Sequence, residues 1–366
     1  MTTRVSDILD RLDLSPLKGT EPIFLKAGDI HLTLRCPAAL RADLAAMLAP
    51  AVVGEGAEDC ITIHVLDCPP LTDLPPVIPW AREPGKVGRK DAYADLADGR
   101  LVVKVRTGMA FLLGQGVAVA FGPAGQNLNQ IVNFANSQIL GAAQRDGWQI
   151  AHAAAVTDGL RGLAVSGLSG GGKSTTILRL MDMGGLSYVT NDRLLLRAAS
   201  DGARGLGVPK PPRINPGTIL GNPRLHGLLT PARLAEVAAM DKADLWSLED
   251  KHDVDIDAVY GAGRTRLATV ITHYWVLNWR HDTDAPTLVR PVSLHDRPDL
   301  LPAIMKSPGV FYHKPDGSFL ADTETPLPAG YLDALRNVAM FEVTGRVDFD
   351  ALADAGRTLF ARAMAT

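Results

Sequence analysis

Apolar and polar positions alternate in two different ways along the 366-residue chain. The first third has short apolar runs between glycine and proline turns, a pattern typical of strands and hairpins. These predicted strands cover residues 23–26, 30–34, 61–65, 92–96, 101–105, 110–113 and 117–121. Apolar residues recur at helical spacing in residues 5–12, 37–50 and 128–143. This part of the chain is predicted to be an α+β domain, and no catalytic cluster stands out in it.

A strand, a glycine-rich loop and a helix follow one another near the middle of the chain. Residues 162–166 (GLAVS) are a short apolar run of strand type, and residues 175–183 (TTILRLMDM) have helical character without a breaker. Residues 150–156 also predict a strand, and residues 157–160 (TDGL) suit a turn. A tight hairpin is therefore predicted to lead directly into the glycine-rich loop.

The later apolar segments complete the predicted secondary structure. Helices are predicted at residues 230–243, 298–306 and 348–364, and a long strand at residues 267–278. Thr230 is the predicted N-cap of the first of these helices. We predict two domains, an N-terminal α+β domain of residues 1–130 and a second domain of residues 131–366.

The composition restricts the class of partner and the compartment. The chain has 37 Lys and Arg against 40 Asp and Glu, a net charge of −3, so no overall field attracts nucleic acid or an anionic membrane. The cysteines, Cys36, Cys60 and Cys68, are scattered and indicate neither a disulfide framework nor a zinc site. A charged N-terminus and the lack of a run of about 18 apolar residues predict a cytoplasmic protein that is not exported.

The glycine-rich loop, residues 167–174 (GLSGGGKS), matches the phosphate-loop pattern G-x-x-x-x-G-K-[ST]. Glycines let backbone N–H groups turn inward around an anion, and the helix that begins near Lys173 adds its positive dipole end. Lys173 is predicted to reach the β- and γ-phosphates of ATP, and the Ser174 hydroxyl to ligate Mg²⁺. A flexible turn with a solvated Lys173 is the alternative, which the strand and helix flanks disfavour. The predicted ATP-binding residues of this segment are Gly167, Ser169, Gly170, Gly171, Gly172, Lys173, Ser174 and Thr175.

Two residues with acid–base chemistry bracket the loop. His152 lies 15 residues before Gly167, on the strand that the hairpin returns towards the phosphates. Residues 187–190 predict a strand that ends at Asn191 and Asp192. A carboxylate at this position can ligate Mg²⁺ or accept a hydroxyl proton.

This arrangement resembles the catalytic domain of the HPr kinase/phosphorylase family, which shares its core with phosphoenolpyruvate carboxykinases. Members of that family have a histidine before the loop and two aspartates after the loop helix, the second of which is the general base. The resemblance implies an α/β fold with a phosphoenolpyruvate carboxykinase-like P-loop kinase core, a mixed sheet with flanking helices. It also implies that Asp192 is the base and that His152 orients or tunes it, although Asn191 replaces the first acid. Residues 209–218 (PKPPRINPGT) are more specifically similar to the HPr-kinase-related proteins called type B.

Several cations are candidates for contact with the transferred phosphate. Four prolines stiffen residues 209–216, where Lys210 and Arg213 face either a phosphoryl or acidic group or only solvent. Arg213 is included among the predicted ATP-binding residues, and Arg264 and Arg266 are further candidates between which the sequence does not choose. The acidic residues of 246–257 suit an exposed charged face better than a metal site.

The predicted function is that of an ATP-dependent kinase. It would transfer the terminal phosphoryl group to a hydroxyl acceptor, a protein serine or threonine, with Lys173, His152 and Asp192 as catalytic residues. The predicted cofactors are ATP and Mg²⁺, with Ser174 and Asp192 as metal ligands. A small-molecule kinase with the same core and a non-catalytic nucleotide-binding regulatory or assembly protein are the alternatives. The acceptor, the reverse phosphorylase reaction and a homo-oligomeric state stay open.

Overall fold

The computed structural model describes residues 3–81, 88–167 and 171–361 and divides the chain into two compact units. Unit 1 comprises Met1–Gly147 and Ser307–Thr325, and unit 2 comprises Trp148–Lys306 and Pro326–Thr366. The sequence predicts a division between residues 130 and 131 instead. The two differ because the helix Leu128–Arg145 and the segment Ser307–Thr325 belong to unit 1, and neither has a sequence feature that marks a domain boundary. No helix of the described residues is both long and apolar enough to cross a bilayer.

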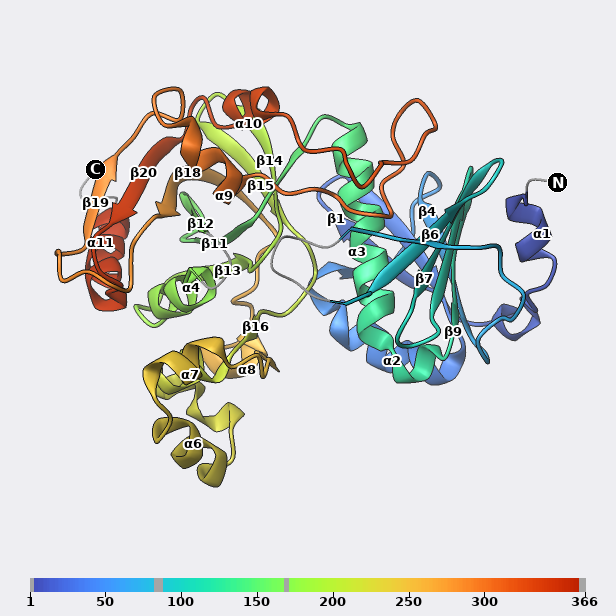
Figure 1. The fold of residues 1–366 in the computed structure, drawn as a ribbon, viewed down its shortest axis with the longest axis horizontal. Coiled ribbons are helices and arrows are strands. Elements are labelled where there is room, and N and C mark those ends of the chain that lie inside the picture. Colours follow the sequence, from blue (N-terminus) through green and yellow to red (C-terminus); the bar gives the residue numbers. More distant parts are fainter. Residues whose placement is uncertain (1–2, 82–87, 168–170, 362–366) are drawn as a thin grey trace. The chain divides into compact units, whose positions relative to one another are not determined.

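Unit 1 is built on a mixed sheet with the strand order β3-β1-β2-β4-β9-β8-β7-β6-β5 among the described residues (Figure 1). Strand β4 pairs in parallel with β2 and β9, and the other pairs are antiparallel. The elements are α1 Val5–Leu9, β1 Ile23–Ala27, β2 Ile30–Arg35, α2 Ala38–Met47, β3 Val52–Val53, β4 Ile61–Asp67, β5 Ile78–Pro79, β6 Asp91–Asp95, β7 Gly99–Lys104, β8 Ala110–Gly114, β9 Val117–Gly122 and α3 Leu128–Arg145. The predicted strands and helices of this region are confirmed, with ends that shift by a few residues.

The late segment Ser307–Thr325 belongs to unit 1 because it packs on that sheet. The buried Arg100 side chain donates to the carbonyl oxygens of Val310 and Leu320 at 3.2 and 2.8 Å. Phe311 packs against the rings of two core phenylalanines, Phe111 and Phe134.

Unit 2 contains a second mixed sheet with the order β10-β14-β15-β18-β12-β11-β13, with β20 beside β18 and β19 beside β20. The central β18 pairs in parallel with β12 and β20 and antiparallel with β15. The strands are β10 Gln149–Ala151, β11 Ala153–Thr157, β12 Gly162–Gly167, β13 Ser187–Thr190, β14 Leu194–Ala199, β15 Gly202–Gly207, β18 Ala268–Leu277, β19 Leu288–Pro291 and β20 Ala339–Thr344. The protein is therefore a mixed α/β structure with large sheets and flanking helices.

Helices cover both faces of the unit 2 sheet. Along β11, Ala154 and Val156 contribute to the core beneath α4 (Lys173–Met181) and α11 (Phe349–Ala361). Ala153 and Ala155 contribute to the opposite core, beneath α9 (Leu301–Ile304) and α10 (Pro328–Ala334). Successive side chains of a strand point to opposite faces, so a strand between two helical layers is apolar throughout. This explains why the first four residues of β11, AAAV, are all apolar.

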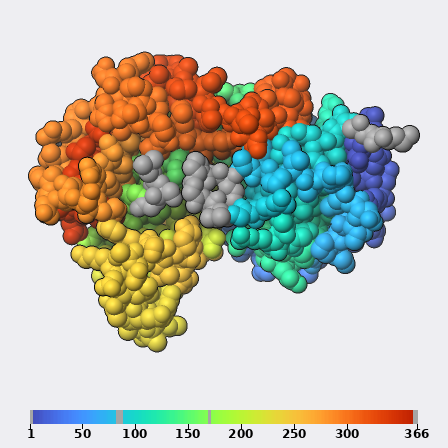
Figure 2. Space-filling model, viewed as in Figure 1, coloured from blue at the N-terminus to red at the C-terminus, as the bar shows by residue number. Residues whose placement is uncertain are grey.

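Short helices form a lobe of unit 2 on the α4 side of the sheet, yellow in Figure 2. They are α5 Pro216–Leu220, α6 Pro231–Ala238, α7 Lys242–Ser247 and α8 Ile256–Tyr260, and β16 (Arg213–Ile214) pairs with β17 (His252–Asp253) at their base. The Thr230 cap is confirmed, because its hydroxyl accepts from the Arg233 N–H. The prediction of one helix over residues 230–243 is wrong, because Asp241 takes an extended conformation and starts α7 as a new N-cap.

Candidate active site

The hairpin before the loop is confirmed and brings His152 to the end of β12. Strand β11 pairs antiparallel with β12, with Ala153 opposite Ser166. The Ser166 hydroxyl donates to the His152 carbonyl oxygen at 2.9 Å. His152 itself interrupts the strand, because β10 before it pairs with β14 and β11 after it pairs with β12 and β13. Its side chain therefore projects at the edge where β12 enters the glycine-rich loop.

The described part of the glycine-rich loop turns sharply into α4. Gly167 ends β12, and the predicted ligands Ser169 and Gly170 lie outside the described residues. The Gly171 carbonyl oxygen accepts from the Trp279 indole N–H at 3.0 Å. Gly172 has a left-handed φ of +91° and directly precedes α4. The glycine conformation and the indole contact together fix how the chain turns into the helix.

Alanine at Gly172 tests this local geometry. An added Cβ would lie 2.8 Å from the Phe349 ring and 3.0 Å from the Trp279 ring, in a conformation that side chains disfavour. We expect Gly172→Ala to lower the free energy of unfolding by about 2–4 kcal/mol in urea denaturation. The matched control is Gly184→Ala, where φ is +77° and nothing lies within 4 Å of the added Cβ. It should lose only about 1–2 kcal/mol, and equal losses in the two variants would contradict tight packing at Gly172.

The first turn of α4 holds the predicted phosphate-binding side chains. Lys173 is buried, and its ammonium donates to the Gly167 carbonyl oxygen at 3.1 Å, which holds it across the loop. Ser174 follows it and is partly buried, and the Thr175 hydroxyl lies 2.8 Å from that of Thr218. Backbone N–H groups in the first turn of a helix have no partner further back in the helix and carry partial positive charge. The residues present therefore fit a nucleotide phosphate.

Asp192 and His152 form the centre of a charged cluster. The His152 Nε2 atom lies 3.2 Å from Asp192 Oδ1. Lys306 Nζ and Arg193 Nε each lie 3.7 Å from Asp192 Oδ2. The Asp192 side chain is 54% exposed and that of Lys306 is 15% exposed. The carboxylate is therefore open to solvent, whereas the ammonium group beside it is largely buried.

These contacts set the protonation of the pair. Burial and the charges of Lys173 and Lys306 lower the pKa of His152, against the opposing effect of Asp192. Partial loss of contact with water would by itself raise the pKa of the Asp192 carboxyl group. The hydrogen bond from His152 and the charges of Lys306 and Arg193 outweigh this effect and hold the pKa well below its usual range. A neutral His152 thus donates its Nε2 hydrogen to an ionised Asp192. Because the charge of Lys173 lowers the pKa of His152, this lysine of the loop interacts electrostatically with the cluster.

The lowered pKa of His152 predicts a loss of stability in acid. Below about pH 6.5 an unfolded histidine binds a proton that folded His152 does not, so the free energy of unfolding falls as the pH falls. His152→Gln keeps an N–H donor and cannot titrate. We expect urea denaturation to show a steeper loss between pH 7 and pH 5 for the wild type than for His152→Gln. Parallel profiles would contradict a partly buried, neutral His152.

Sequence reasoning missed two residues of the cluster, Arg193, which directly follows Asp192, and Lys306. Lys306 reaches Asp192 because residues 304–306 lie antiparallel to residues 150–152. His152 N–H donates to the Ile304 carbonyl, and Lys306 N–H donates to the Ile150 carbonyl. No local motif marks Lys306, and only this long-range bridge identifies it. Lys210, which the sequence did flag, also lies near the cluster, and burial together with the charge of Arg193 lowers its pKa to about 8.

The candidate arginines have other contacts. Arg213, predicted to bind ATP, is 41% exposed and forms an ion pair with Asp253 at 2.8 Å. Arg264 donates to the backbone carbonyls of Leu186 and Tyr260. Arg266 lies beside Gly159, in the turn at the opposite end of β12 from the glycine-rich loop. The cations with charges that act on Asp192 are thus Lys306 and Arg193, rather than these three arginines.

The described residues include no group of three or more His, Cys, Asp or Glu side chains that could hold a metal ion. Magnesium at nucleotide sites usually keeps waters and phosphate oxygens as ligands, with only one or two from the protein. The Ser174 hydroxyl, in the first turn of α4, fits that limited protein contribution. Asp192 fits it less well, because the charges of Lys306 and Arg193 beside Oδ2 oppose a second cation there.

Comparisons with known proteins give a match among the solved structures. No model of a known protein family matches the chain, and no curated protein matches it either. The Hpr(Ser) kinase/phosphatase from Coxiella burnetii matches with 11% sequence identity over 59% of this chain and 97% of that chain, at a TM-score of 0.31. A likeness at this TM-score assigns neither a fold nor a function to the chain.

Proposed function

We propose that this protein is an ATP-dependent kinase with a phosphoenolpyruvate carboxykinase-like P-loop core, and that it phosphorylates a hydroxyl group, of a protein serine or threonine. The observation that carries the proposal is the meeting of two features at the end of β12. One is the phosphate loop with Lys173 held across it at Gly167. The other is Asp192, ionised and held by His152 and Lys306.

Phosphoryl transfer asks a protein mainly to position groups and to neutralise charge. The loop amides and Lys173 would bind the β- and γ-phosphates, and Ser174 would contribute to the Mg²⁺ site. When bound, Mg²⁺ supplies further neutralisation of the phosphate charge. These residues would bind ATP, the phosphoryl donor.

Asp192 would act on the hydroxyl group that accepts the phosphoryl group. In the transfer step the acceptor oxygen forms a bond to the γ-phosphorus, while the bond from that phosphorus to the β,γ-bridging oxygen breaks and ADP leaves. The acceptor proton passes to Asp192. Because its pKa is low, Asp192 is a weak base, and its main contribution would be to orient the hydroxyl and to take the proton late. His152, neutral and donating to Asp192, would fix the orientation of the carboxylate.

Lys306 would serve as a second cation at the transferred phosphoryl group. Its ammonium lies near Asp192, and its side chain is largely buried, so its charge acts with little screening by solvent. The transferred group gains negative charge on its oxygens at the same place. Lys306 would thus neutralise charge there and keep Asp192 ionised.

Lys306→Met tests this role. We expect kcat to fall by about 10- to 100-fold with little change in the KM for ATP, because the contact matters most in the transition state. Steady-state kinetics would separate kcat from KM. The control is Lys251→Met, an exposed lysine of the same unit, which should be unaffected. An unchanged kcat for Lys306→Met would exclude Lys306 from the transfer step.

The proposal as a whole is tested by transfer of label from γ-labelled ATP. Purified protein should release ADP and label an acceptor when incubated with Mg²⁺ and protein fractions as acceptors. Labelling of small molecules alone would replace the protein acceptor by a small one. Tight ATP binding without any turnover would replace the kinase by a nucleotide-binding protein that does not transfer phosphate.

A further inference from the structure

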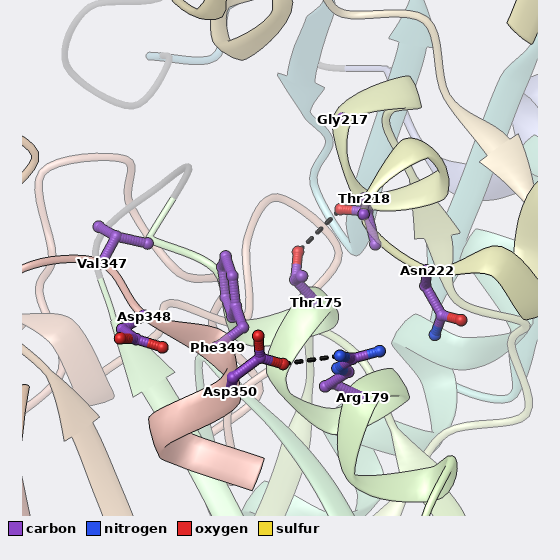
Figure 3. Close-up of a pocket in the computed structure, with 10 residues that line it drawn as sticks. Thr175, Arg179, Gly217, Thr218, Asn222, Val347, Asp348, Phe349 and Asp350 are labelled. Carbon is purple, nitrogen blue, oxygen red and sulfur yellow. Dashed lines mark hydrogen bonds and ion pairs between the residues drawn. The ribbon is translucent and has the colours of Figure 1, made fainter. Parts of the chain in front are cut away.

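A pocket of about 350 Å³ opens beside the phosphate loop, on the α4 face of the unit 2 sheet (Figure 3). Its walls come from the first turns of α4, from α5 and from the start of α11. Thr175 and Thr218 meet on one side, and the ring of Phe349 stands beside Thr175. A pocket of this size lies within the range of small-molecule sites in proteins.

The pocket is continuous with the phosphate loop but separate from the acceptor cluster. Thr175 directly follows Ser174 of the loop, whereas His152, Asp192 and Lys306 do not line the pocket. A nucleotide with its γ-phosphate near Asp192 must extend away from that cluster. The pocket adjoins the loop at Thr175 and offers space for the rest of such a nucleotide.

The chemistry of the pocket suits a nucleoside better than a phosphate. Asp348 and Asp350 contribute two carboxylates, which accept hydrogen bonds, against one lining cation, Arg179. Asp350 forms an ion pair with Arg179 at 2.6 Å, and Asp348 caps α11 by accepting from the Ala351 N–H. Ribose hydroxyls and exocyclic amino groups of bases are donors that match these acceptors. The Phe349 ring offers an aromatic surface for a base.

Phe349 is also fixed in place by the loop. Its ring packs edge-on against Trp279 with centroids 5.1 Å apart, and Trp279 donates to the Gly171 carbonyl. The same ring would contact any Cβ at Gly172. An aromatic wall held against the phosphate loop is therefore ready before a ligand binds, which lowers the ordering cost of binding.

We propose that this pocket binds the nucleoside moiety of the nucleoside triphosphate whose phosphates occupy the loop. The inference rests on the proposed function and goes beyond it in assigning a second, separate part of the binding site. It predicts that the two parts can be separated by ligands that contain only one of them. Inorganic tripolyphosphate has the phosphates without the nucleoside, while ATP has both.

The test measures the affinity of the full-length protein for Mg-ATP and for Mg-tripolyphosphate by calorimetry. Phe349→Leu removes the aromatic surface but stays apolar, and Thr218→Phe fills the pocket from the opposite wall. Both variants should bind ATP about ten-fold more weakly and tripolyphosphate within two-fold of the wild type. Phe360→Leu, at the other end of α11 and outside the pocket, is the matched control and should change neither affinity.

The other outcomes separate this inference from the proposed function. Wild-type affinity for ATP in both pocket variants would overturn the nucleoside assignment. An equal loss of affinity for ATP and for tripolyphosphate would also overturn it, because the variants would then act through the loop. Either result leaves the kinase proposal intact if Lys173→Met weakens the binding of both ATP and tripolyphosphate. Failure of the wild type to bind either ligand would overturn both proposals.

Discussion

Asp192→Asn is expected to keep Mg-ATP affinity and to lose phosphoryl transfer by about 10²- to 10⁴-fold. The amide keeps the shape of the side chain and loses the charge that orients the acceptor hydroxyl. His152 Nε2, 3.2 Å from Asp192, can still donate to the amide oxygen, so the local packing should survive. Nucleotide binding depends on the loop and on Lys173 and should therefore be nearly unchanged. Calorimetry for ATP and a single-turnover assay for transfer measure the two effects separately.

Two further variants show how Asp192 acts. Asp244→Asn, at an exposed carboxylate of α7, is the matched control and should transfer phosphate at the wild-type rate. Rescue of Asp192→Asn by excess Mg²⁺ or Mn²⁺ would reassign Asp192 as a metal ligand. Asn191→Asp restores the acidic pair of the family that the sequence resembles and tests whether a second carboxylate adds a metal site. Transfer by Asp192→Asn at the wild-type rate would falsify the proposed mechanism.

The local part of the site could be predicted from the sequence because its contacts are local. The hairpin of β11 and β12 closes through the turn at Asp158, whose carboxylate accepts from the N–H groups of Leu160 and Arg161. The loop and α4 follow within a few residues. Asp192 follows β13, which pairs with β11 next to β12. Short sequence separation and strong turn chemistry together specify this arrangement.

The remaining parts depend on pairings between distant segments. Lys306 joins the cluster only because Met305 bridges to Ala151. Arg213 takes Asp253 as its partner because two two-residue strands, β16 and β17, bring them together. Strands this short have no periodicity to detect. The assignment of residues 307–325 to unit 1 likewise depends on tertiary packing around Arg100, which no local pattern shows.

The split of the predicted helix at residues 230–243 has a different cause. The apolar spacing is compatible with one long helix, but Asp241 competes as a helix start. Aspartate favours the N-cap and the extended conformation before a helix over the interior of one. In the structure Asp241 occupies the N-cap position of α7, with φ −63° and ψ 147° and no capping hydrogen bond from its side chain, and α6 and α7 are separate helices. Periodicity detected the helical segments, while the extended backbone at Asp241 separates them.

Lys173→Met is expected to lower kcat/KM by about 10³-fold, through weaker ATP binding and slower transfer together. The ammonium is buried and held at Gly167, so its charge is little screened and is aimed across the loop. Methionine fills similar space without the charge, which limits the loss to electrostatics.

The same charge lowers the pKa of His152. Lys173→Met should therefore raise that pKa, which NMR titration of the imidazole can measure independently of ATP. Lys242→Met, an exposed lysine at the start of α7, is the matched control and should leave both quantities unchanged. A wild-type kcat/KM in Lys173→Met would refute the phosphate-loop assignment. A shifted pKa with normal ATP affinity would instead show a lysine that belongs to the acid–base cluster but not to a nucleotide site.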